Sequence, residues 1–353
     1  MNSATQQLRA RGQSLWLDFI TRALIENGTL RRYIGELGVT GLTSNPTILH
    51  QAIARGDSYG AAIRAGAAAG RAAEDLVFAL AVDDLTAAAD LLRPIHDATG
   101  GRDGWVSLEV SPLIADDTGA TLAQARELAR RAARPNLLIK IPGTAAGLAA
   151  VEQAIYAGVP VNVTLLFTAE HCRSAAEAYL RGIERRVADR LDPRIGSVAS
   201  MFVSRWDTAV AGKVPPEWHN RLGIAVAKQA YRAYRDLLAG PRWRKLADAG
   251  AWPQRLLWGS TGTKDPKASD TLYVEALVAP DTINTIPEAT LLAFADHGSV
   301  PGVLPDDGGD ADEVLASFRR LGINDAQLGA RLQREGTQSF ARSWNELLQA
   351  VAR

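Results

Sequence analysis

Short, nearly continuous apolar segments recur along the chain and alternate with longer stretches of helical periodicity. Segments of this length and apolar character are typical of strands that are buried on both faces of a parallel sheet. Repeated alternation of such strands with helices indicates parallel βα units. Eight units in succession predict a closed (β/α)8 barrel, an α/β fold that needs about 250 residues. The strand candidates are residues 15–18, 39–44, 106–110, 137–141, 159–163, 197–203, 256–260 and 282–286.

Two of the intervening helices have recognisable ends. The helical pattern that follows Thr144 has this residue as its N-cap and Gly158 as its stop. The next helical pattern begins after Thr168, which is also a capping residue. The two patterns support the alternation of strand and helix.

The chain has 353 residues, which is more than the barrel alone needs. We expect the surplus in three places: the tail before residue 14, a helical stretch at 211–255, and the segment after residue 288. Additional helices should therefore accompany the barrel at the N-terminus, in its second half and at the C-terminus.

Residues 297–312 are rich in Gly, Pro and Asp and form the best linker candidate. Two helical patterns follow, at 313–321 and 325–351, and they are too short to form a domain of ordinary size. We therefore expect a single domain over residues 1–353, with the barrel at about 14–297 and a C-terminal helical cap at about 313–351.

The amino-acid composition limits the partners, the compartment and the kinds of site that we expect for this chain. Lys and Arg together number 39, as do Asp and Glu, so the formal net charge is zero and favours neither nucleic acid nor an acidic membrane as partner. No apolar run reaches about 18 residues, and the N-terminus lacks the apolar core of a signal peptide. With one cysteine, Cys172, no internal disulfide can form, which favours a reducing compartment such as the cytoplasm. The five histidines are scattered, so we expect no metal site.

Polar residues fall where the apolar strand candidates end. Functional side chains of a (β/α)8 barrel lie at the carboxyl ends of its strands, so these residues are the candidates for the site. They are Asp18, Thr43 with Asn45, Glu109, Lys140, Asn162 with Thr164, Ser200 with Arg205, and Lys264.

Lys140 is the most informative of them, because it interrupts the apolar segment LLIKIPG. Burial lowers the pKa of a lysine, and a neutral amine can attack a ketone to form a Schiff base. Glu109 and Asp18, in neighbouring strands, could move protons during such a reaction. The structural alternative, that these charges form ion pairs or caps, stays open for each of the three.

The remaining candidates also have structural alternatives. Asn45 precedes a proline and is a good helix N-cap, although a cap at the mouth of a barrel can also bind a sugar hydroxyl. Asn162 and Thr164 could be ordinary hydrogen-bonding residues at a strand end. Arg205 could equally pair with Asp207 on a solvated face.

Taken together and in order, the segments resemble the transaldolase family, in particular its longer bacterial members. The resemblance runs from residue 14 to about 297, and the C-terminal helices also look like those of the longer members. The matching segments are LWLDFI, GLTSNPTIL, VSLEVSP, LIKIPGT, VNVTLLFT, SVASMFVSRWDTAV and LLWGSTGTKDPKASDTLYVEALVAPDTINTIPEATL.

The resemblance implies catalytic roles. Lys140 would be the Schiff-base lysine, and Asp18 would be the acid and base at the hydroxyl of carbon 4. Glu109 and Thr164 would hold the water that shuttles protons.

The resemblance also implies substrate contacts. Asn45 and Asn162 would bind hydroxyls of a dihydroxyacetone unit, with Thr43 and Ser200 nearby. Arg205 would bind the substrate phosphate.

The chain departs from the family pattern at two positions. Lys264 stands where many members have a second phosphate-binding arginine, and a lysine lacks the planar fork of a guanidinium. Ser111 stands where many members have an aspartate.

The implied reaction is the transfer of a dihydroxyacetone unit from sedoheptulose 7-phosphate or fructose 6-phosphate to an aldose phosphate, in the pentose phosphate pathway. The imine is the electron sink, so we expect no metal and no organic cofactor. The alternatives are a fructose 6-phosphate aldolase, or a non-catalytic protein that binds sugar phosphates on the same barrel. The sequence leaves the acceptor aldehyde and the oligomeric state open.

Overall fold

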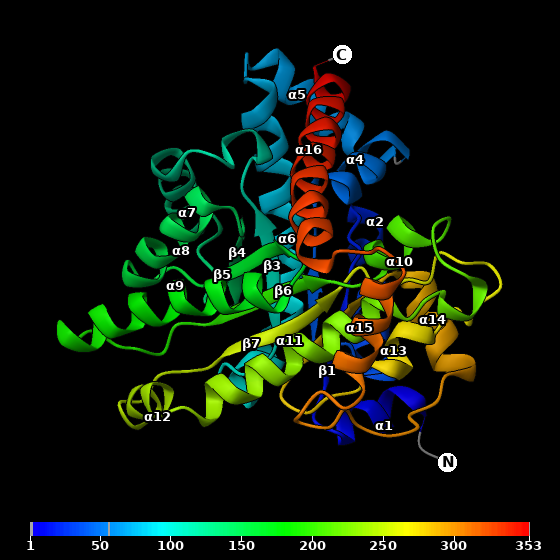
Figure 1. The fold of residues 1–353 in the computed structure, drawn as a ribbon. Coiled ribbons are helices and arrows are strands. Elements are labelled where there is room, and N and C mark those ends of the chain that lie inside the picture. The colour runs from blue at the N-terminus through cyan, green and yellow to red at the C-terminus, as the bar shows by residue number, and fades with distance from the viewer. Residues whose placement is uncertain (1–2, 56, 353) are drawn as a thin grey trace.

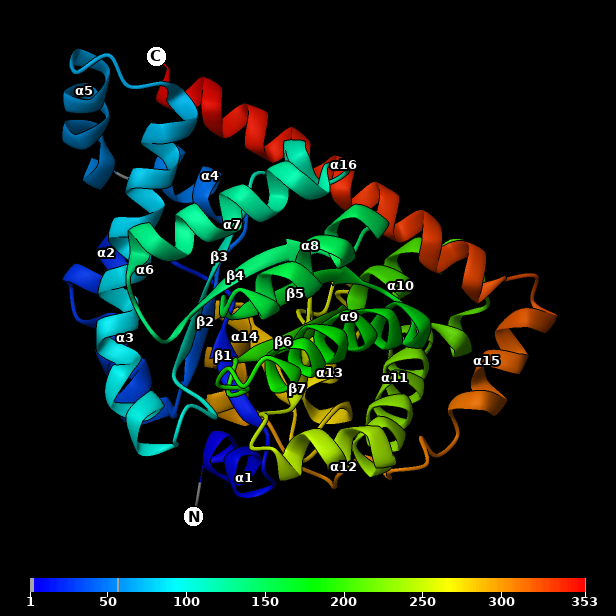
Figure 2. The ribbon, with the colours of Figure 1, turned by 90° about the vertical axis from the view of Figure 1, so that its left-hand side faces the viewer.

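A computed structural model of the chain describes residues 3–55 and 57–352 and consists of a closed barrel of parallel strands surrounded by helices (Figures 1 and 2). The strands are hydrogen-bonded in chain order, and β1 pairs with β8 to close the barrel. The predicted (β/α)8 fold is therefore confirmed. The strands are β1 (Ser14–Leu17), β2 (Gly41–Thr43), β3 (Trp105–Glu109), β4 (Leu137–Pro142), β5 (Val161–Leu166), β6 (Ser197–Phe202), β7 (Gln254–Gly259) and β8 (Ile283–Ile286).

The helices follow the strands around the outside of the barrel. Short π and 3-10 turns occur at Tyr33–Leu37, Asp57–Tyr59, Pro112–Ile114 and Pro216–Trp218. The helices are α1 (Ala4–Ala10), α2 (Arg22–Glu26), α3 (Thr29–Arg32), α4 (Pro46–Arg55), α5 (Gly60–Ala68), α6 (Ala73–Ala98), α7 (Thr118–Ala132), α8 (Ala145–Tyr156), α9 (Ala169–Ala188), α10 (Ser204–Val210), α11 (Leu222–Ala239), α12 (Pro241–Asp248), α13 (Leu272–Ala276), α14 (Glu288–His297), α15 (Ala311–Arg320) and α16 (Asp325–Val351).

The helix ends expected from sequence are found. The Thr144 hydroxyl accepts from the Gly147 amide at 3.0 Å at the start of α8, and Gly158, with φ of 85°, follows its end. At the start of α9 the Thr168 hydroxyl accepts from the His171 amide at 3.0 Å. Each hydroxyl satisfies a backbone donor that the first turn of a helix leaves without a partner.

The distribution of the additional residues was predicted incompletely. Helices do occur before β1, between β6 and β7, and after β8, as expected. The structure adds a fourth place, the connection between β2 and β3, which holds α4, α5 and the 26-residue α6. Residues 60–73 of this connection consist largely of Ala and Gly, so large apolar side chains do not mark a helical period there.

Alternation along the strands divides the barrel interior into two layers. Trp16, Leu138, Val198 and Ile283 belong to one buried apolar cluster, together with Trp105 and Leu257. Because side chains of a strand alternate between its two faces, the residue two positions later points inward as well. Two positions after those four apolar residues come, in the same order, Asp18, Lys140, Ser200 and Thr285. A packed apolar layer thus carries a polar layer at the carboxyl ends of the strands.

The C-terminal helices lie against the barrel rather than apart from it. α15 packs on α11, and the long α16 contacts α4, α6, α10 and β5. Figure 2 shows α16, in red and orange, running along one side of the molecule past the ends of α7, α8 and α10. Its position brings a segment remote in sequence close to the ends of β4, β5 and β6.

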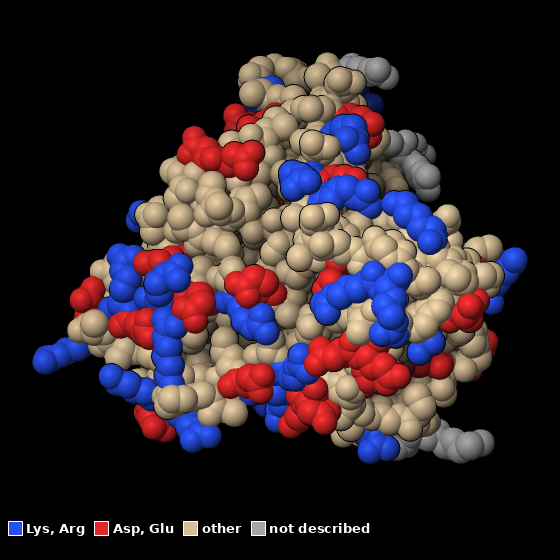
Figure 3. All heavy atoms as spheres, viewed as in Figure 1, with Lys and Arg blue, Asp and Glu red and all other residues tan. Residues whose placement is uncertain are grey.

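The surface drawn in Figure 3 carries basic and acidic side chains intermixed, as the zero net charge of the chain suggests. Within the part of the chain that the structure describes, no helix combines the length and hydropathy of a membrane span.

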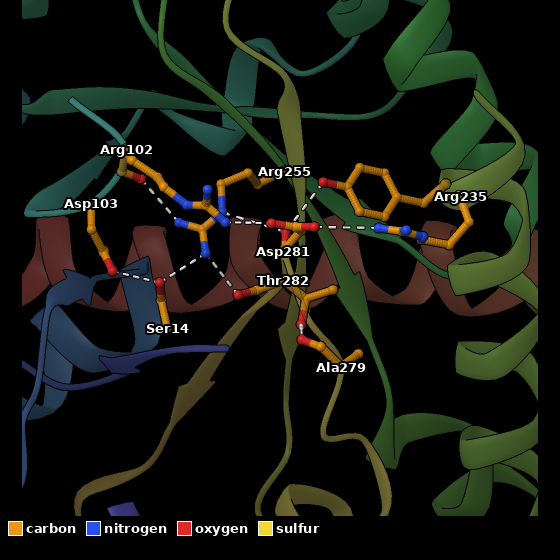
Figure 4. A network of polar contacts seen from close by, with 9 residues as sticks. Ser14, Arg102, Asp103, Arg235, Arg255, Ala279, Asp281 and Thr282 are labelled. Carbon is orange, nitrogen blue, oxygen red and sulfur yellow. Dashed lines mark hydrogen bonds and ion pairs between the residues drawn. The ribbon is translucent and has the colours of Figure 1, made fainter. Parts of the chain in front are cut away.

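A buried arginine forms hydrogen bonds that connect strands at the amino end of the barrel (Figure 4). Arg255 of β7 donates to the Ser14 hydroxyl at 2.8 Å, to the Thr282 carbonyl at 2.8 Å and to the Arg102 carbonyl at 3.0 Å. It therefore connects β7 with β1, with the start of β8 and with the loop before β3. Nearby, Asp281 forms ion pairs with Arg102 and Arg235.

We predict that Arg255→Ala lowers the free energy of unfolding by about 3 kcal/mol, because it removes the donor of several hydrogen bonds at a buried position. Arg102→Ala is the matched control, because it removes an exposed ion pair and keeps the backbone carbonyl that Arg255 binds, so its effect should be much smaller. Urea denaturation followed by tryptophan fluorescence measures both. Equal effects of the two substitutions would contradict the assignment.

Candidate active site

The polar candidates converge on one cavity of about 360 Å³ at the carboxyl ends of the strands. Glu109, Asn162 and Thr164 are buried beside the residues that line it. The structure therefore brings all ten predicted residues to one end of the barrel. The lining residues among them are Asp18, Thr43, Asn45, Lys140, Ser200, Arg205 and Lys264.

Lys140 projects from β4 and is only 4% exposed. Its Nζ donates to the Ser44 carbonyl at 3.0 Å and lies 3.2 Å from Oε2 of Glu109. The second contact follows from the strand register, in which Glu109 of β3 is directly opposite Lys140. The amine is thus held between a carbonyl and a carboxylate, with one side facing the cavity.

The expectation of three charges on neighbouring strands was right for two of them. Glu109 and Lys140 lie on adjacent strands, but β2 separates the strand of Asp18 from that of Glu109. Closure of the barrel nevertheless directs all three side chains to the same interior, because its opposite walls face each other.

Burial raises the pKa of Glu109 to about 6, and the nearby Lys140 ammonium opposes this shift. Oε2 of Glu109 forms this ion pair with Nζ and has no further hydrogen-bond partner among the described residues. The buried hydroxyl of Thr164, on the other side of β4, also has no hydrogen-bond partner among the described residues. An ion-paired carboxylate and a hydroxyl without a partner therefore flank the strand that carries Lys140.

Asp18 accepts a hydrogen bond from Thr43, which in turn contacts Thr285. The Thr43 hydroxyl donates to Oδ1 of Asp18 at 2.7 Å and lies 2.7 Å from the Thr285 hydroxyl. Burial raises the pKa of Asp18, while the positive charge of Lys140 and the Thr43 hydrogen bond act in the opposite direction. A carboxyl group with a raised pKa is suited to exchange a proton with a bound hydroxyl.

A second set of hydrogen bonds links polar side chains of three strands, β3, β5 and β6. The Ser200 hydroxyl donates to Oδ1 of Asn162 at 2.7 Å, and Nδ2 of Asn162 donates to the Ser107 hydroxyl at 3.0 Å. These bonds determine the orientation of the Asn162 amide. Asn45 has the capping role that its sequence context predicted, because its Oδ1 accepts from the Ile48 amide at 2.9 Å, and it also lines the cavity.

Arg205 presents a cation without a counterion. Its Cζ lies 4.9 Å from the ring centre of Phe202, and the guanidinium makes no hydrogen bond or ion pair with any residue of the described segments. The alternative pairing with Asp207 is wrong. That carboxylate is buried on the other side of the helix and accepts from the Leu222 amide, the Gly223 amide and the Tyr273 hydroxyl.

Lys264 provides a second cation at the mouth of the same cavity. Its side chain is exposed and, over residues 3–55 and 57–352, forms no ion pair. Two cations that line one cavity and form no ion pair within the described segments are suited to bind an anion such as a phosphate.

The site thus combines a buried amine, two carboxyl groups with raised pKa values and an anion-binding end. This combination suits imine chemistry on a phosphorylated carbonyl compound. No cluster of three or more His, Cys, Asp or Glu residues within the described ranges has the arrangement of a metal site.

Comparison with known proteins supports this interpretation. Residues 15–351 match the family described as Transaldolase/Fructose-6-phosphate aldolase. The chain belongs to this family.

Relatives that carry the name transaldolase match almost the whole chain. Transaldolase 1 of Streptomyces avermitilis is 44% identical over 98% of this chain and 94% of its own length. Transaldolase 1 of Streptomyces coelicolor is 45% identical over 99% of this chain and 94% of its own. The transaldolase of Thermobifida fusca is 45% identical over 100% of this chain and 98% of its own length. The family resemblance inferred from the ordered motifs is confirmed.

Sequence reasoning missed several residues of this transaldolase-family site. Thr285, which completes the Asp18 group, follows from alternation once Ile283 is recognised as an inward residue of β8. Phe340 of α16 and Glu288 of α14 also line the cavity. Phe340 lies far along the chain from the barrel strands, and no local signal indicated that it would reach the site.

We predict that Lys140→Met raises the pKa of Glu109 above its value of about 6 in the native protein, because the substitution removes the cation that stabilises the carboxylate. The pH titration of 13C-labelled glutamate carboxyl signals measures it, with Glu109→Gln identifying the resonance. A native pKa at the ordinary value of 4.5 would show that the carboxylate is hydrated.

Because the folded pKa is the higher one, Glu109 contributes less to stability as the pH rises from 4.5 through about 6.

Proposed function

We propose that the chain is a transaldolase that transfers a dihydroxyacetone unit from a ketose phosphate to an aldose phosphate through a Schiff base on Lys140. The donors are sedoheptulose 7-phosphate or fructose 6-phosphate, as in the pentose phosphate pathway. The observation that carries the proposal is the Lys140 amine, 4% exposed, 3.2 Å from a carboxylate and in the same cavity as the unpaired Arg205. Family membership and the named relatives support it.

The first step joins the amine to the substrate. Nζ of Lys140 attacks carbon 2 of the ketose, and loss of the carbonyl oxygen as water leaves an iminium. Glu109 and Thr164 hold the water that carries protons between nitrogen and oxygen. The position of the Glu109 carboxylate and of the Thr164 hydroxyl, which has no partner among the described residues, on either side of β4 supports this role.

The second step breaks the bond between carbons 3 and 4. Asp18 takes the proton of the carbon 4 hydroxyl, and that oxygen forms the aldehyde of the departing aldose phosphate. The electron pair of the broken bond moves into the iminium and gives an enamine on Lys140. The raised pKa of Asp18 supports its role as a base that can return the proton.

The third step reverses this sequence on a second aldehyde. The enamine carbon attacks the aldehyde of the acceptor, Asp18 returns a proton to the new hydroxyl, and water releases from Lys140 a ketose three carbons longer than the acceptor. The two directions use the same groups, so the site needs no further acid or base.

The remaining side chains bind the substrate. Asn45 and Asn162, with Thr43 and Ser200 nearby, contact the hydroxyls of the three-carbon unit. Arg205 and Lys264 bind the phosphate, which the absence of a protein counterion for either cation supports within the described segments. The one cysteine, Cys172, is free and buried, in keeping with a cytoplasmic enzyme.

We predict that fructose 6-phosphate and erythrose 4-phosphate together yield glyceraldehyde 3-phosphate and sedoheptulose 7-phosphate, measured by a coupled assay for the triose phosphate. Fructose 6-phosphate alone should give little turnover, because the enamine stays on Lys140 until an acceptor arrives. Steady release of dihydroxyacetone without an acceptor would instead identify a fructose 6-phosphate aldolase. The lack of any product in both assays would leave a binding protein.

We predict that borohydride, added with fructose 6-phosphate, attaches the three-carbon unit to Lys140 irreversibly, because it reduces the iminium to an amine. Mass spectrometry of the digested protein locates the added group. Lys140→Met should abolish the adduct, whereas Lys213→Met, which removes a lysine outside the cavity, should not. Label on another lysine of the native protein would contradict the mechanism.

A further inference from the structure

The C-terminal helix reaches the active site with one face. Gln333, Gly336 and Phe340 are spaced by three and four residues, so they lie on the same side of α16. Nε2 of Gln333 donates at 3.0 Å to the carbonyls of both Gly143 and Leu165. These carbonyls follow β4 and lie near the end of β5, so α16 is bound to the strand ends that carry Lys140 and Thr164.

Gly336 is the point at which α16 approaches the anion-binding end of the cavity. A Cβ on this residue would lie 3.1 Å from Nη1 of Arg205 and 2.9 Å from Cδ2 of Leu165. Both distances are shorter than ordinary carbon contacts. Glycine at this position therefore leaves the space in which the Arg205 guanidinium lies.

Phe340 contacts the same guanidinium, and its ring centre also lies 5.9 Å from Nζ of Lys140. Its side chain is 3% exposed, its ring centre is 5.8 Å from Cζ of Arg205, and Phe202 presents a second ring at 4.9 Å. The two ring centres are 6.5 Å apart. Aromatic rings hold a guanidinium through its face and leave the N–H groups at its edge free. This explains how Arg205 can be held in place without a carboxylate partner.

We propose that α16 completes the phosphate subsite, with Phe340 and Gly336 as positioning residues that fix the Arg205 guanidinium for the substrate phosphate. This inference rests on the proposed function, because it assumes that Arg205 binds the phosphate of a sugar substrate. A carboxylate in place of the rings would occupy the donors that the phosphate needs and would repel it. The C-terminal helix therefore determines how strongly the enzyme prefers phosphorylated substrates.

The test compares a phosphorylated substrate pair with an unphosphorylated one. Fructose 6-phosphate with erythrose 4-phosphate forms the first pair, and dihydroxyacetone with glyceraldehyde forms the second. Gly336→Ala should raise KM for fructose 6-phosphate and the inhibition constant of inorganic phosphate while turnover of the unphosphorylated pair stays near that of the native enzyme. Phe340→Leu, which removes the ring and keeps an apolar side chain, should raise both constants about 2- to 30-fold, the range expected for one cation–π contact.

A double substitution shows whether Gly336 acts through Arg205. Arg205→Ala alone should impair the phosphorylated pair more than the unphosphorylated pair, and to a larger extent than Gly336→Ala. If Gly336 acts through the guanidinium, Arg205→Ala combined with Gly336→Ala should be no worse than Arg205→Ala alone. Gln338→Ala, at an exposed position of α16 outside the cavity, is the control and should change neither pair.

The outcomes separate the two proposals. If the native enzyme neither transfers the three-carbon unit nor forms the Lys140 adduct, the proposed function fails. If the native enzyme is active but Gly336→Ala impairs both substrate pairs equally or adds to the effect of Arg205→Ala, or if Phe340→Leu leaves the inhibition constant of phosphate unchanged, then α16 has only a structural role and the inference is wrong. Borohydride trapping with dihydroxyacetone verifies that each variant retains a folded Lys140 site.

Discussion

The contact between Lys140 and Glu109 is the interaction on which the rest of the site depends. Placing an amine and a carboxylate among buried groups costs free energy that their mutual attraction only partly offsets. The barrel tolerates this pair because the strand register puts the two residues opposite each other and the Ser44 carbonyl accepts from Nζ. The same burial gives Glu109 a pKa of about 6, where it can both accept and release protons near neutral pH.

The two ends of the barrel differ in role: residues at the amino end stabilise the fold, and residues at the carboxyl end form the candidate active site. At the amino end, Arg255 and its acceptors join β7, β1 and β8 through satisfied hydrogen bonds, and the apolar layer of Trp16 and Leu138 fills the interior above them. Among the described residues, buried polar atoms without a hydrogen-bond partner occur at both ends of the barrel, and those beside the cavity belong to Glu109 and Thr164. Groups without internal partners are available to a substrate, and the packed layer beneath them keeps their positions fixed.

Arg205, which we propose binds the phosphate, is held in place by other contacts than the rest of the site. Asp18 and Asn162 are oriented by hydrogen bonds from neighbouring strands. Arg205 is instead held by the rings of Phe202 and Phe340, and the second ring comes from a helix outside the barrel. A cation held by rings keeps all of its hydrogen-bond donors for a ligand, which agrees with the phosphorylated substrates that we propose.

The sequence by itself determined the barrel, its strands and most of the candidate site. Buried parallel strands require continuous apolar segments, so a charged residue within one, such as Lys140, is conspicuous, and the order of the motifs identified the family. The tertiary structure alone decided that Arg205 forms no ion pair within the described segments, that Thr285 supports the Asp18 group, and that Phe340 of α16 reaches the cavity. These facts depend on which side chains meet across a closed barrel and on where a remote helix packs, and neither leaves a local periodic signal. Alternation and capping act between neighbours in sequence, whereas the complete surroundings of a buried charge are set by residues that only folding brings together.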